Sequence, residues 1–511
     1  MSLSMKKWIS TKTEPLTKEN EALFQFRRTK IVSTLGPATN TEEKIGELVD
    51  AGVNVFRLNF SHGDHEYHGK VIDNIHKVMA TKRKTYCAVM LDTKGPEIRT
   101  GLNAEGKDIS VKKGQQLILT TDDEFNGKGN NEKIYVDYKN ITKVLSIGKR
   151  VLIDDGLVGC EVVSIGDDHL VTKVLNDGEL GSRKGVNLPG IKVDLPAVTE
   201  RDRKDLLFGR DNNVDFVAAS FIRKPEDVNE IRKVLGRRGA HIKIISKIEN
   251  AEGIHNFDAI LEVSDGIMVA RGDMGVEIPL EKVALAQKMM IAKCNVAGKP
   301  VITATQMLES MVHNPRPTRA EANDVANAVM DGSDAVMLSG ETAKGAYPIK
   351  AVKTMAKICV SAESSLEYNE MYNNIRSSTL SAEGMRSLSI TETIASSAVK
   401  VTMEVDAKFL LTITETGNTA MLCSKYRPAP PIFAITQVDR TARQLALVWG
   451  VRPVLVETVI GTDGVIRREI MIQMNEGRLK ENDCYVVTCG NKEGVSGHTN
   501  MLKISYANQI N

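Results

Sequence analysis

A lysine and two acidic residues stand at or just after short apolar runs in the middle of the chain. Lys247 and Glu249 lie two residues apart in the run Ile244–Asn250, and Asp273 lies in the run Val269–Glu277. On an extended backbone, residues two apart point to the same side. Mg²⁺ takes oxygen ligands, typically one or two protein carboxylates together with substrate oxygens, which leaves the ammonium group to face developing negative charge. These residues therefore indicate phosphoryl-transfer or enolate chemistry at a divalent-cation site.

Each of these segments also has an ordinary explanation. Charged residues at strand ends are commonly solvated, and a Lys/Glu pair of this spacing is commonly a weak surface pair. The choice depends on where the other polar residues lie in the elements that position them. A repeated unit that places polar residues at one point would gather them into a single site.

Short apolar runs alternate with helical stretches over much of the chain. With residues 96–194 set aside, the unit spans roughly 240 residues, close to the roughly 250 of a (β/α)₈ barrel. Near-continuous apolar strands also suit a parallel sheet that is buried on both faces. One helix is expected to begin at a capping box, Thr39-x-x-Glu42, and to end near Gly52. The fold class is therefore predicted to be α/β, with a TIM barrel built on strands at Lys30–Leu35, Val53–Leu58, Cys87–Asp92, Val214–Ser220, Ile242–Ile248, Gly266–Ala270, Pro300–Ala304 and Ala335–Leu338.

Two further domains are expected besides the barrel. Residues 96–194 contain short alternating segments separated by Gly, Asp and Asn, which predicts a small antiparallel β-barrel inserted after the third strand. From residue 366 a second α/β alternation predicts a C-terminal doubly wound domain, 366–511. The barrel then comprises 25–95 and 195–365, and 1–24 form a polar N-terminal arm. The expected strands outside the barrel are Gln116–Thr120, Lys133–Val136, Arg150–Ile153, Leu157–Val163, Leu170–Val174, Lys408–Ile413, Pro431–Ile435, Pro453–Val456, Cys484–Thr488 and Met501–Tyr506.

Polar residues recur where the predicted barrel strands end. The reacting groups of barrel enzymes lie at the C-terminal ends of the strands. Taken singly, Asn59 and Ser61 fit a turn, Thr305 fits a helix cap, and His62 fits a satisfied core or cap position better than a site. Together they would place three arginines, a lysine and several carboxylates at one end of the barrel. Gathering these charges costs desolvation free energy unless bound ions or substrate balance them. The residues are Arg57, Asn59, Ser61, His62, Asp92, Thr93, Glu97, Arg99, Lys247, Glu249, Arg271, Gly272, Asp273, Thr305, Ser339, Gly340 and Glu341.

Composition narrows the class of protein. The 511 residues carry 67 Lys plus Arg against 65 Asp plus Glu, a formal charge of +2, so no global field attracts nucleic acid or a membrane. No apolar run is long enough to read as a membrane span or a signal peptide. The seven cysteines are scattered and lack CxxC spacing, which favours free thiols in a reducing compartment. A cytoplasmic protein with no nucleic-acid or membrane partner is expected.

Eight long motifs closely resemble the pyruvate kinase family. The resemblance covers roughly residues 25–506, and it implies an N-terminal arm, a catalytic barrel (A domain), an inserted lid (B domain) and a C-terminal regulatory domain (C domain). It also implies the last step of glycolysis, transfer of a phosphoryl group from phosphoenolpyruvate to ADP to give pyruvate and ATP. The motifs are FRLNFSHG (56–63), LDTKGPEIRTG (91–101), KGVNLPG (184–190), VDLPAVTERD (193–202), IISKIENAEG (244–253), VARGDMGVEI (269–278), ATQMLESM (304–311) and LSGETAKG (338–345).

The resemblance assigns roles to individual residues. Glu249 and Asp273 are expected to ligate Mg²⁺, with Mn²⁺ as a substitute, and a second Mg²⁺ arrives with ADP. Lys247 resembles the transition-state stabiliser, and with Arg57 it is expected to contact the transferring phosphoryl group, as phosphoryl transfer depends on positioning and charge neutralisation. A water with Thr305 is ranked first as the proton relay to the enolate, and Ser339 with Glu341 second. K⁺ is expected at Asn59, Ser61, Asp92 and Thr93; substrate also at Gly272, Asp273 and Thr305; and nucleotide at Asn59, His62, Arg99 and Lys184.

Two positions allow finer expectations from the same resemblance. In this family a glutamate at the position of Glu97 accompanies K⁺ dependence, whereas a lysine there removes it. Members activated by fructose 1,6-bisphosphate carry a lysine where Glu415 stands, and a tryptophan and an arginine in a later loop that here reads 490–497 and has neither. We therefore expect no activation by this bisphosphate. The turn before one C-domain helix still offers an effector phosphate loop, Thr414, Thr416, Gly417, Asn418 and Thr419.

Rival functions remain open at this point. A different Mg²⁺-dependent barrel enzyme acting on phosphoenolpyruvate or another oxoacid needs no ADP lid, so residues 96–194 with Arg99 and Lys184 argue against it. In a catalytically silent regulatory paralogue, substitutions at the key residues are expected. Arg57, Lys247 and Glu249 all keep the residue type of the family motifs. By resemblance the chain is also expected to form a homotetramer.

Overall fold

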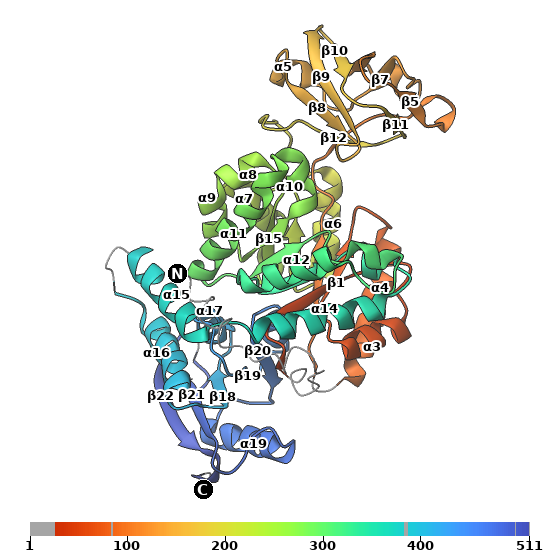
Figure 1. The fold of residues 1–511 in the computed structure, drawn as a ribbon. Helices are drawn as coiled ribbons and strands as arrows, with labels where there is room; N and C mark the ends of the chain where they lie inside the picture. The colour runs from red at the N-terminus through yellow and green to blue at the C-terminus, as the bar shows by residue number, and fades with distance from the viewer. Residues whose placement is uncertain (1–25, 83–84, 383–386, 496, 510–511) are drawn as a thin grey trace.

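The computed structural model describes residues 26–82, 85–382, 387–495 and 497–509, and the predicted arm lies outside these described residues. The described chain forms three bodies in a row (Figure 1). The barrel lies in the middle, the lid projects from one end of it, and the C-terminal domain lies at the other end. The predicted limits at 95/96, 194/195 and 365/366 all fall in segments between helices and strands. The limits themselves stay predictions.

Eight parallel strands close into a barrel in the order β1-β17-β16-β15-β14-β13-β3-β2. Each predicted strand is confirmed to within two residues of its expected bounds, because runs that are apolar on both faces have few ways to be buried. The strands are β1 (Lys30–Leu35), β2 (Val55–Asn59), β3 (Ala88–Asp92), β13 (Phe216–Ala219), β14 (Lys243–Ile248), β15 (Gly266–Ala270), β16 (Val301–Ala304) and β17 (Ala335–Leu338).

The barrel core has an inner and an outer part. Successive strand residues point to opposite faces, so Val32 packs with the residues that fill the barrel while its neighbour Ile31 packs under the surrounding helices. The inner part contains Met90, Phe216 and Met268, all buried. A filled barrel is a rigid support, and it leaves the rim as the place for a site.

Helices cover the outside of the barrel. Helix α3 begins at Thr41, whose side chain accepts a hydrogen bond from Lys44 N, and ends at Gly52 with a φ of 106°. The predicted capping box at Thr39 is wrong, because that hydroxyl is buried and donates to Thr342 O instead. The helices of this part are α3 (Glu42–Ala51), α4 (His65–Thr81), α6 (Glu200–Asp211), α7 (Pro225–Leu235), α8 (Ala251–His255), α9 (Phe257–Val263), α10 (Arg271–Glu277), α11 (Leu280–Ala297), α12 (Arg319–Met330), α13 (Gly340–Ala343) and α14 (Pro348–Glu363), with 3₁₀ turns at Arg237–Gly239 and Glu309–Val312.

The lid is a curled sheet in the order β4-β12-β8-β9-β10-β6-β7. A bridge between Thr100 and Val136, which adjoin the two edge strands, brings its edges together as the predicted small barrel requires. Strands β6 and β7 pair in parallel, which the expected antiparallel pattern does not include. The elements are β4 (Ile98–Arg99), β5 (Ile109–Val111), β6 (Gln116–Thr120), β7 (Lys133–Tyr135), α5 (Ile141–Val144), β8 (Arg150–Ile153), β9 (Val158–Ile165), β10 (His169–Val174), β11 (Gly178–Leu180) and β12 (Gly185–Asn187), with 3₁₀ turns at Ala104–Gly106 and Asp123–Phe125.

The C-terminal domain has a five-stranded sheet in the order β20-β19-β18-β21-β22. Neighbouring residues Leu410 and Leu411 belong to apolar clusters on opposite faces, so the sheet is covered on both sides as a doubly wound domain requires. Only β22 runs antiparallel within this sheet. The elements are α15 (Tyr368–Ala382), α16 (Ile390–Glu404), β18 (Phe409–Ile413), α17 (Asn418–Lys425), β19 (Ile432–Thr436), α18 (Asp439–Leu445), β20 (Val451–Leu455), α19 (Thr462–Asn475), β21 (Cys484–Gly490), β22 (Thr499–Tyr506) and a 3₁₀ turn at Ala507–Gln509.

The C-terminal domain closes the bottom of the barrel. Leu447 is fully buried and packs with the residues that fill the barrel. Arg427 Nη1 lies 2.8 Å from Asp334 Oδ1, just before β17, and Lys30 Nζ donates to Val451 O at 2.6 Å. Burial, with Arg27 and Arg452 nearby, lowers the pKa of Lys30 to about 7. Since the N-terminal ends of the strands are covered here, the opposite rim is left for substrates.

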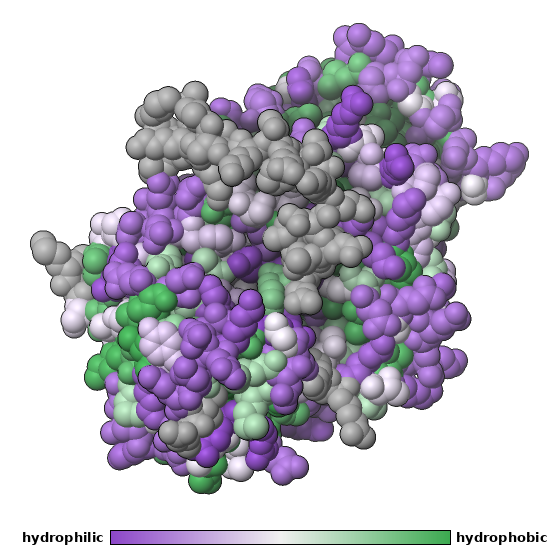
Figure 2. All heavy atoms as spheres, turned by 60° about the horizontal axis from the view of Figure 1, so that its bottom comes forward, coloured by the Kyte–Doolittle hydropathy of each residue, from purple (hydrophilic) through white to green (hydrophobic). Residues whose placement is uncertain are grey.

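The surface that Figure 2 shows is largely hydrophilic, with apolar residues scattered among the polar ones. Among the described residues, no helix has the length and apolar character needed to cross a bilayer.

Candidate active site

Lys247 is the centre of a charged cluster at the C-terminal rim of the barrel. It lies on β14 with its side chain nearly buried, and its Nζ is 3.1 Å from Asp92 Oδ1, 3.0 Å from Glu249 Oε1 and 2.7 Å from Ser220 Oγ. The expected placement of Lys247 and Glu249 on one side of the strand is thus confirmed. Burial opposes the ammonium charge, but Asp92 and Glu249 outweigh it and raise the pKa of Lys247. The group is held as a cation.

Arg57 joins the cluster from β2. Its Nε lies 2.6 Å from Asp92 Oδ2, and its Nη1 donates to Thr34 Oγ1 at 2.9 Å. Burial alone would raise the pKa of Asp92, but Arg57 and Lys247 hold it below its usual value. One carboxylate therefore orients two cations toward the same opening, where a charge-assisted hydrogen bond to phosphate is strong.

Glu249 and Asp273 supply the acidic side of the site. Glu249 is buried and accepts a hydrogen bond from Phe221 N. Burial raises its pKa to about 7 against the opposing charge of Lys247, and Asp273 adds to the rise. Asp273 also helps to raise the pKa of Asp155, which comes from the lid, after burial as the larger cause. Carboxylates thus converge here from the barrel and the lid, close enough for Asp273 to affect the other two.

This donor set fits a hard divalent cation. Mg²⁺ typically uses one or two carboxylates and completes its shell with water and substrate oxygens, and Glu249 with Asp273 provides that pair. Within the described residues, no group of three or more His, Cys, Asp or Glu side chains is placed to hold a metal ion.

The predicted monovalent-cation residues lie at the adjacent ends of β2 and β3. Asn59 and Asp92 are partners in the register of the two strands. Asn59 Oδ1 accepts from Ser61 N at 3.1 Å, and Thr93 O accepts from Ser220 Oγ at 2.6 Å. These residues all carry oxygen atoms that could ligate a cation. In proteins, oxygen atoms replace the hydration shell of K⁺.

Thr305 follows β16 in a strained backbone conformation. Its φ is 69°, which is uncommon for a β-branched residue and costs on the order of 1–3 kcal/mol. Its Oγ1 accepts from Gly272 N at 2.7 Å and donates to Ala304 O at 2.6 Å. The structure therefore brings Thr305 and Gly272 together. Strain of this kind occurs mainly where the surrounding structure fixes a functional group.

Glu341 is fixed by the backbone around it. Its buried carboxylate accepts from Leu308 N at 3.0 Å and from Ser339 N at 2.7 Å, so it connects the segments that follow β16 and β17. Burial is the main cause of its raised pKa. The role of Ser339 and Glu341 in proton transfer stays a prediction.

The predicted nucleotide residues lie partly on the lid. Arg99 Nε is 2.7 Å from Glu97 Oε2, and Lys184 Nζ is 2.9 Å from Asp154 Oδ2. Each cation is thus paired with a neighbouring carboxylate. His62 is exposed at the barrel rim, where its carbonyl contacts the ring of His68 at 2.9 Å.

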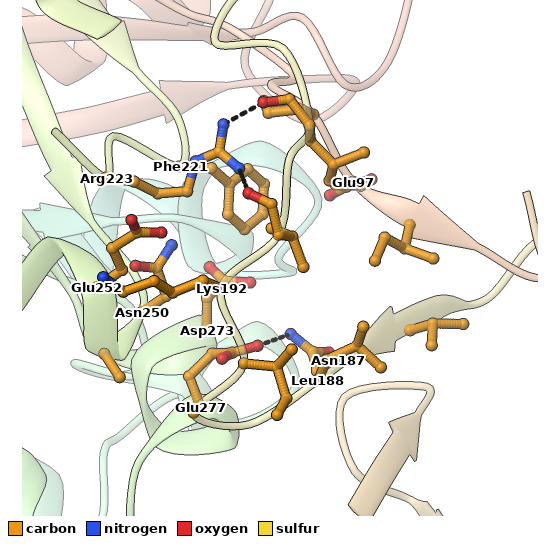
Figure 3. Close-up of a pocket in the computed structure, with 18 of the residues that line it drawn as sticks. Glu97, Asn187, Leu188, Lys192, Phe221, Arg223, Asn250, Glu252, Asp273 and Glu277 are labelled. Carbon is orange, nitrogen blue, oxygen red and sulfur yellow. Dashed lines mark hydrogen bonds between the residues drawn. The ribbon is translucent and has the colours of Figure 1, made fainter. Parts of the chain in front are cut away.

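A cavity of about 240 Å³ lies between the barrel and the lid (Figure 3). Asp273 borders it together with Arg223 and Asn250. Across it, Asn187 of β12 donates to Glu277 of α10 at 2.9 Å, so the lid touches the barrel on this side.

Sequence reasoning missed the residues after β13. Ser220 bridges Lys247 and Asp92, since its Oγ lies 2.7 Å from Nζ and 3.3 Å from Oδ1. Phe221 N–H binds Glu249. The rule that found the other residues, polar groups at the end of each barrel strand, also applies to this fourth strand and could have found Ser220.

The predicted effector loop lies in the C-terminal domain, apart from this cluster. Gly417, with a φ of 85°, precedes α17, and its N–H binds Thr414 Oγ1 at 3.0 Å, so the expected turn before a helix is confirmed. A cavity of about 200 Å³ is bordered by this loop and by Glu493, whose carboxylate accepts from Gly461 N and Thr462 N.

Comparison with known proteins identifies the family. A family model described as pyruvate kinase, barrel domain, matches residues 26–352, more than half of the chain, and one described as pyruvate kinase, alpha/beta domain, matches residues 392–505. The chain belongs to the pyruvate kinase family.

Relatives and a solved structure agree with this assignment. A pyruvate kinase of Dictyostelium discoideum is 50% identical over 94% of both chains, and one of Schizosaccharomyces pombe is 48% identical over 99% of both chains. The crystal structure of a pyruvate kinase from Cryptosporidium parvum superposes with a TM-score of 0.92, at 45% identity, over 97% of this chain and 99% of that one. As a member of the family, the chain is a phosphotransferase.

Proposed function

We propose that the chain transfers a phosphoryl group from phosphoenolpyruvate to ADP, giving pyruvate and ATP. The observation that carries the proposal is the buried Lys247–Asp92–Arg57 cluster beside Glu249 at the barrel rim, facing a lid that carries Arg99 and Lys184. In the reaction the P–O bond of the enol phosphate breaks, while the phosphorus atom forms a bond to a terminal phosphate oxygen of ADP. The remaining enolate takes a proton at carbon.

The placement of the cationic side chains supports the roles proposed for them. Lys247 and Arg57 are fixed by shared contact with Asp92, so they need no reorganisation to stabilise charge on the phosphoryl group. Arg99 and Lys184, on the lid, approach ADP when they leave their carboxylate partners. Positioning and charge neutralisation account for most of the catalysis of phosphoryl transfer.

Glu249 and Asp273 are proposed to hold Mg²⁺, for which Mn²⁺ can substitute, and Asn59, Ser61, Asp92 and Thr93 to hold K⁺. When bound there, these ions supply positive charge next to the phosphoryl oxygens. Burial raises the pKa values of Glu249 and Asp155, and the nearby charge of Asp273 adds to both rises, so the three carboxylates lie close enough to support a cation between the barrel and the lid.

The proton donor to the enolate is proposed to be a water held by Thr305. Thr305→Ala is expected to slow the incorporation of solvent deuterium into the methyl group of pyruvate by about 10²-fold, the scale of general acid–base catalysis. NMR measures the exchange. Thr305→Ser keeps the hydroxyl and is expected to retain most of it. Normal exchange in Thr305→Ala, with loss in Ser339→Ala, would favour the relay through Ser339 and Glu341 instead.

K⁺ dependence is proposed to follow from Glu97. Glu97→Lys places a fixed positive charge near Arg99, so we expect this variant to turn over without added K⁺, whereas the wild type requires it. Initial rates in K⁺ and in tetramethylammonium chloride of equal ionic strength measure the difference. Glu161→Lys, on an exposed position of lid strand β9, is the matched control and should keep the wild-type requirement. An active Glu97→Lys variant that still needs K⁺ contradicts the assignment.

Insensitivity to fructose 1,6-bisphosphate is proposed from the charge around the C-domain cavity. Glu415 and Glu493 border it with a single basic residue, Lys492, so the acidic side chains outnumber the basic one and disfavour a bisphosphate. We expect no change in the KM for phosphoenolpyruvate when the bisphosphate is titrated into the assay. A marked fall in KM would overturn this point, and other phosphorylated effectors at Thr414–Thr419 can be tested in the same way.

We also propose a cytoplasmic homotetramer, as the family resemblance implies. The edge strand β22 exposes Ile504 and Tyr506 at 49% and 48% of their surface, which offers one face for association. Sedimentation equilibrium should give about four times the 56.0 kDa chain mass. A monomer at micromolar concentration would contradict the proposal.

The function itself is tested by following pyruvate from phosphoenolpyruvate with and without ADP. We expect formation only when ADP is present, with one ATP per pyruvate. Pyruvate without ADP indicates another phosphoenolpyruvate enzyme on this barrel. No turnover by folded protein, with candidate sugar phosphates also added, indicates a silent paralogue.

A further inference from the structure

The loop that follows β13, residues 220–223, contacts the charged cluster and the segments that join the barrel to the lid. Ser220 binds Lys247, and Phe221 N–H binds Glu249. The same four residues contact both segments through which the chain passes between barrel and lid, which we call the outgoing hinge (93–97) and the returning hinge (188–199). One short loop thus connects the lid to the proposed phosphoryl and metal sites.

The outgoing hinge is packed closely onto this loop at Gly95. Gly95 has a φ of 73°, and a Cβ there would lie 2.8 Å from both Phe221 Cδ2 and Ser220 Cβ. Its N–H binds Asp202 Oδ1 at 3.0 Å. A side chain at this position has neither the conformation nor the space, so the outgoing hinge is fixed against the loop.

The returning hinge is held by Arg223. Its Nη1 donates to Val193 O at 2.9 Å and its Nη2 donates to Leu195 O, so the guanidinium holds two carbonyls of the returning hinge (Figure 3). The residue is 5% exposed, and Asp227 lies 3.9 Å from its Nε. A planar guanidinium presents its donors in a rigid fork, whereas a lysine ammonium is a single point. The two bonds therefore fix the direction of the hinge as well as its position.

The backbone between the clamp and the metal carboxylate is strained. Phe221 has a φ of 56°, an outlier for a bulky residue. This conformation lets its N–H face Glu249 while Arg223, two residues on, faces the hinge. A tight turn thus connects the residue that holds the hinge to the residue that binds the carboxylate.

We propose that Arg223 is a positioning residue that sets the orientation of the lid relative to Lys247 and Glu249. The inference rests on the proposed function. Arg99 and Lys184 move with the lid, whereas Arg57 and Lys247 belong to the barrel. Loss of the two hydrogen bonds of Arg223 therefore misplaces the lid residues that are proposed to contact ADP. The barrel residues that are proposed to contact phosphoenolpyruvate keep their positions.

Steady-state kinetics of Arg223→Met and Arg223→Lys test this inference. Methionine keeps the length of the aliphatic side chain and removes the N–H donors. Lysine keeps the positive charge and removes the planar guanidinium that binds two carbonyls at once. Since a misplacement of about 1 Å can cost about 10²-fold in rate, we expect kcat to fall about 10- to 100-fold in Arg223→Met. The KM for ADP should rise about tenfold and the KM for phosphoenolpyruvate less than threefold. Arg223→Lys should also raise the KM for ADP more than the KM for phosphoenolpyruvate, but by a smaller factor.

Arg232→Met is the matched control, because Arg232 also donates to a backbone carbonyl, Val263 O at 2.9 Å, but lies away from the hinge. It should keep both KM values. Equal rises of the two KM values in Arg223→Met, or no change in either, overturn the proposal, since a purely structural role would not separate the substrates.

A distance measurement tests the clamp without relying on turnover. All seven cysteines are buried, so spin labels can be directed to exposed positions by Lys149→Cys in the lid and Glu43→Cys on the barrel. Pulsed electron resonance should give a broader distance distribution in Arg223→Met than in the wild-type background. Identical distributions overturn the proposal. A wild-type protein without turnover would refute the proposed function, and the distance measurement would still decide the role of Arg223.

Discussion

Lys247→Met is expected to lower kcat for pyruvate formation by about 10³-fold or more. Cationic groups that stabilise the transferring phosphoryl group are worth about 10³- to 10⁵-fold in related chemistry, and Lys247 is the buried cation that touches both Asp92 and Glu249. The methionine fills a similar volume without charge, but it leaves the two carboxylates facing each other. Initial rates with saturating phosphoenolpyruvate, ADP, Mg²⁺ and K⁺ measure the loss.

Lys243→Met is the matched control for this variant. Lys243 lies on the same strand, β14, but at its opposite end, where it faces Asp265 at 3.4 Å. Its replacement should leave kcat within about twofold, because the ion pair that is lost is only partly buried and lies away from the C-terminal rim. Circular dichroism and a melting curve show whether each variant is folded. A folded Lys247→Met protein that keeps more than a tenth of the wild-type kcat contradicts the role given to this lysine.

Asp273→Asn is expected to have the second large effect, a loss of about 10²-fold in rate at 1 mM Mg²⁺ that higher Mg²⁺ or Mn²⁺ partly restores. The substitution removes one of two proposed anionic ligands, and hard cations bind chiefly through charged oxygens. It also removes a charge that helps to raise the pKa values of Glu249 and Asp155. A titration of rate against Mg²⁺ concentration measures the shift of the half-saturation point.

Asp258→Asn serves as the control for the acidic substitution. Asp258 is exposed and pairs with Lys293 at 2.5 Å on the outside of the barrel. Its metal dependence should match the wild type. If Asp273→Asn keeps the wild-type half-saturation point and only its maximal rate changes, Asp273 does not ligate the metal.

The barrel was predictable because its signal is local and repeated. Each strand is a short run that is apolar on both faces, and burial leaves such a run few alternatives. The same repetition predicts that Arg57, Asp92, Lys247 and Glu249 lie near one another, since parallel strands end at the same rim. The contacts between their side chains agree with that expectation.

Features that depend on partners distant in the sequence were not predictable in this way. The hydroxyl of Thr39 fits a capping box, but a tertiary contact with Thr342 takes it. Leu447 is an ordinary apolar residue of the C-terminal domain until the docked structure places it in the floor of the barrel. Arg223 looks like a surface arginine, and only the path of the returning hinge shows that two carbonyls surround it.

The measurement that tests the central claim most directly is pyruvate formation from phosphoenolpyruvate and ADP in the four combinations of Mg²⁺ and K⁺, with wild type and Lys247→Met side by side. The site geometry predicts turnover that requires Mg²⁺, rises with K⁺ and collapses in the variant. Equal turnover by the two proteins, or turnover indifferent to both ions, would contradict the assignment of phosphoryl transfer to the Lys247 cluster.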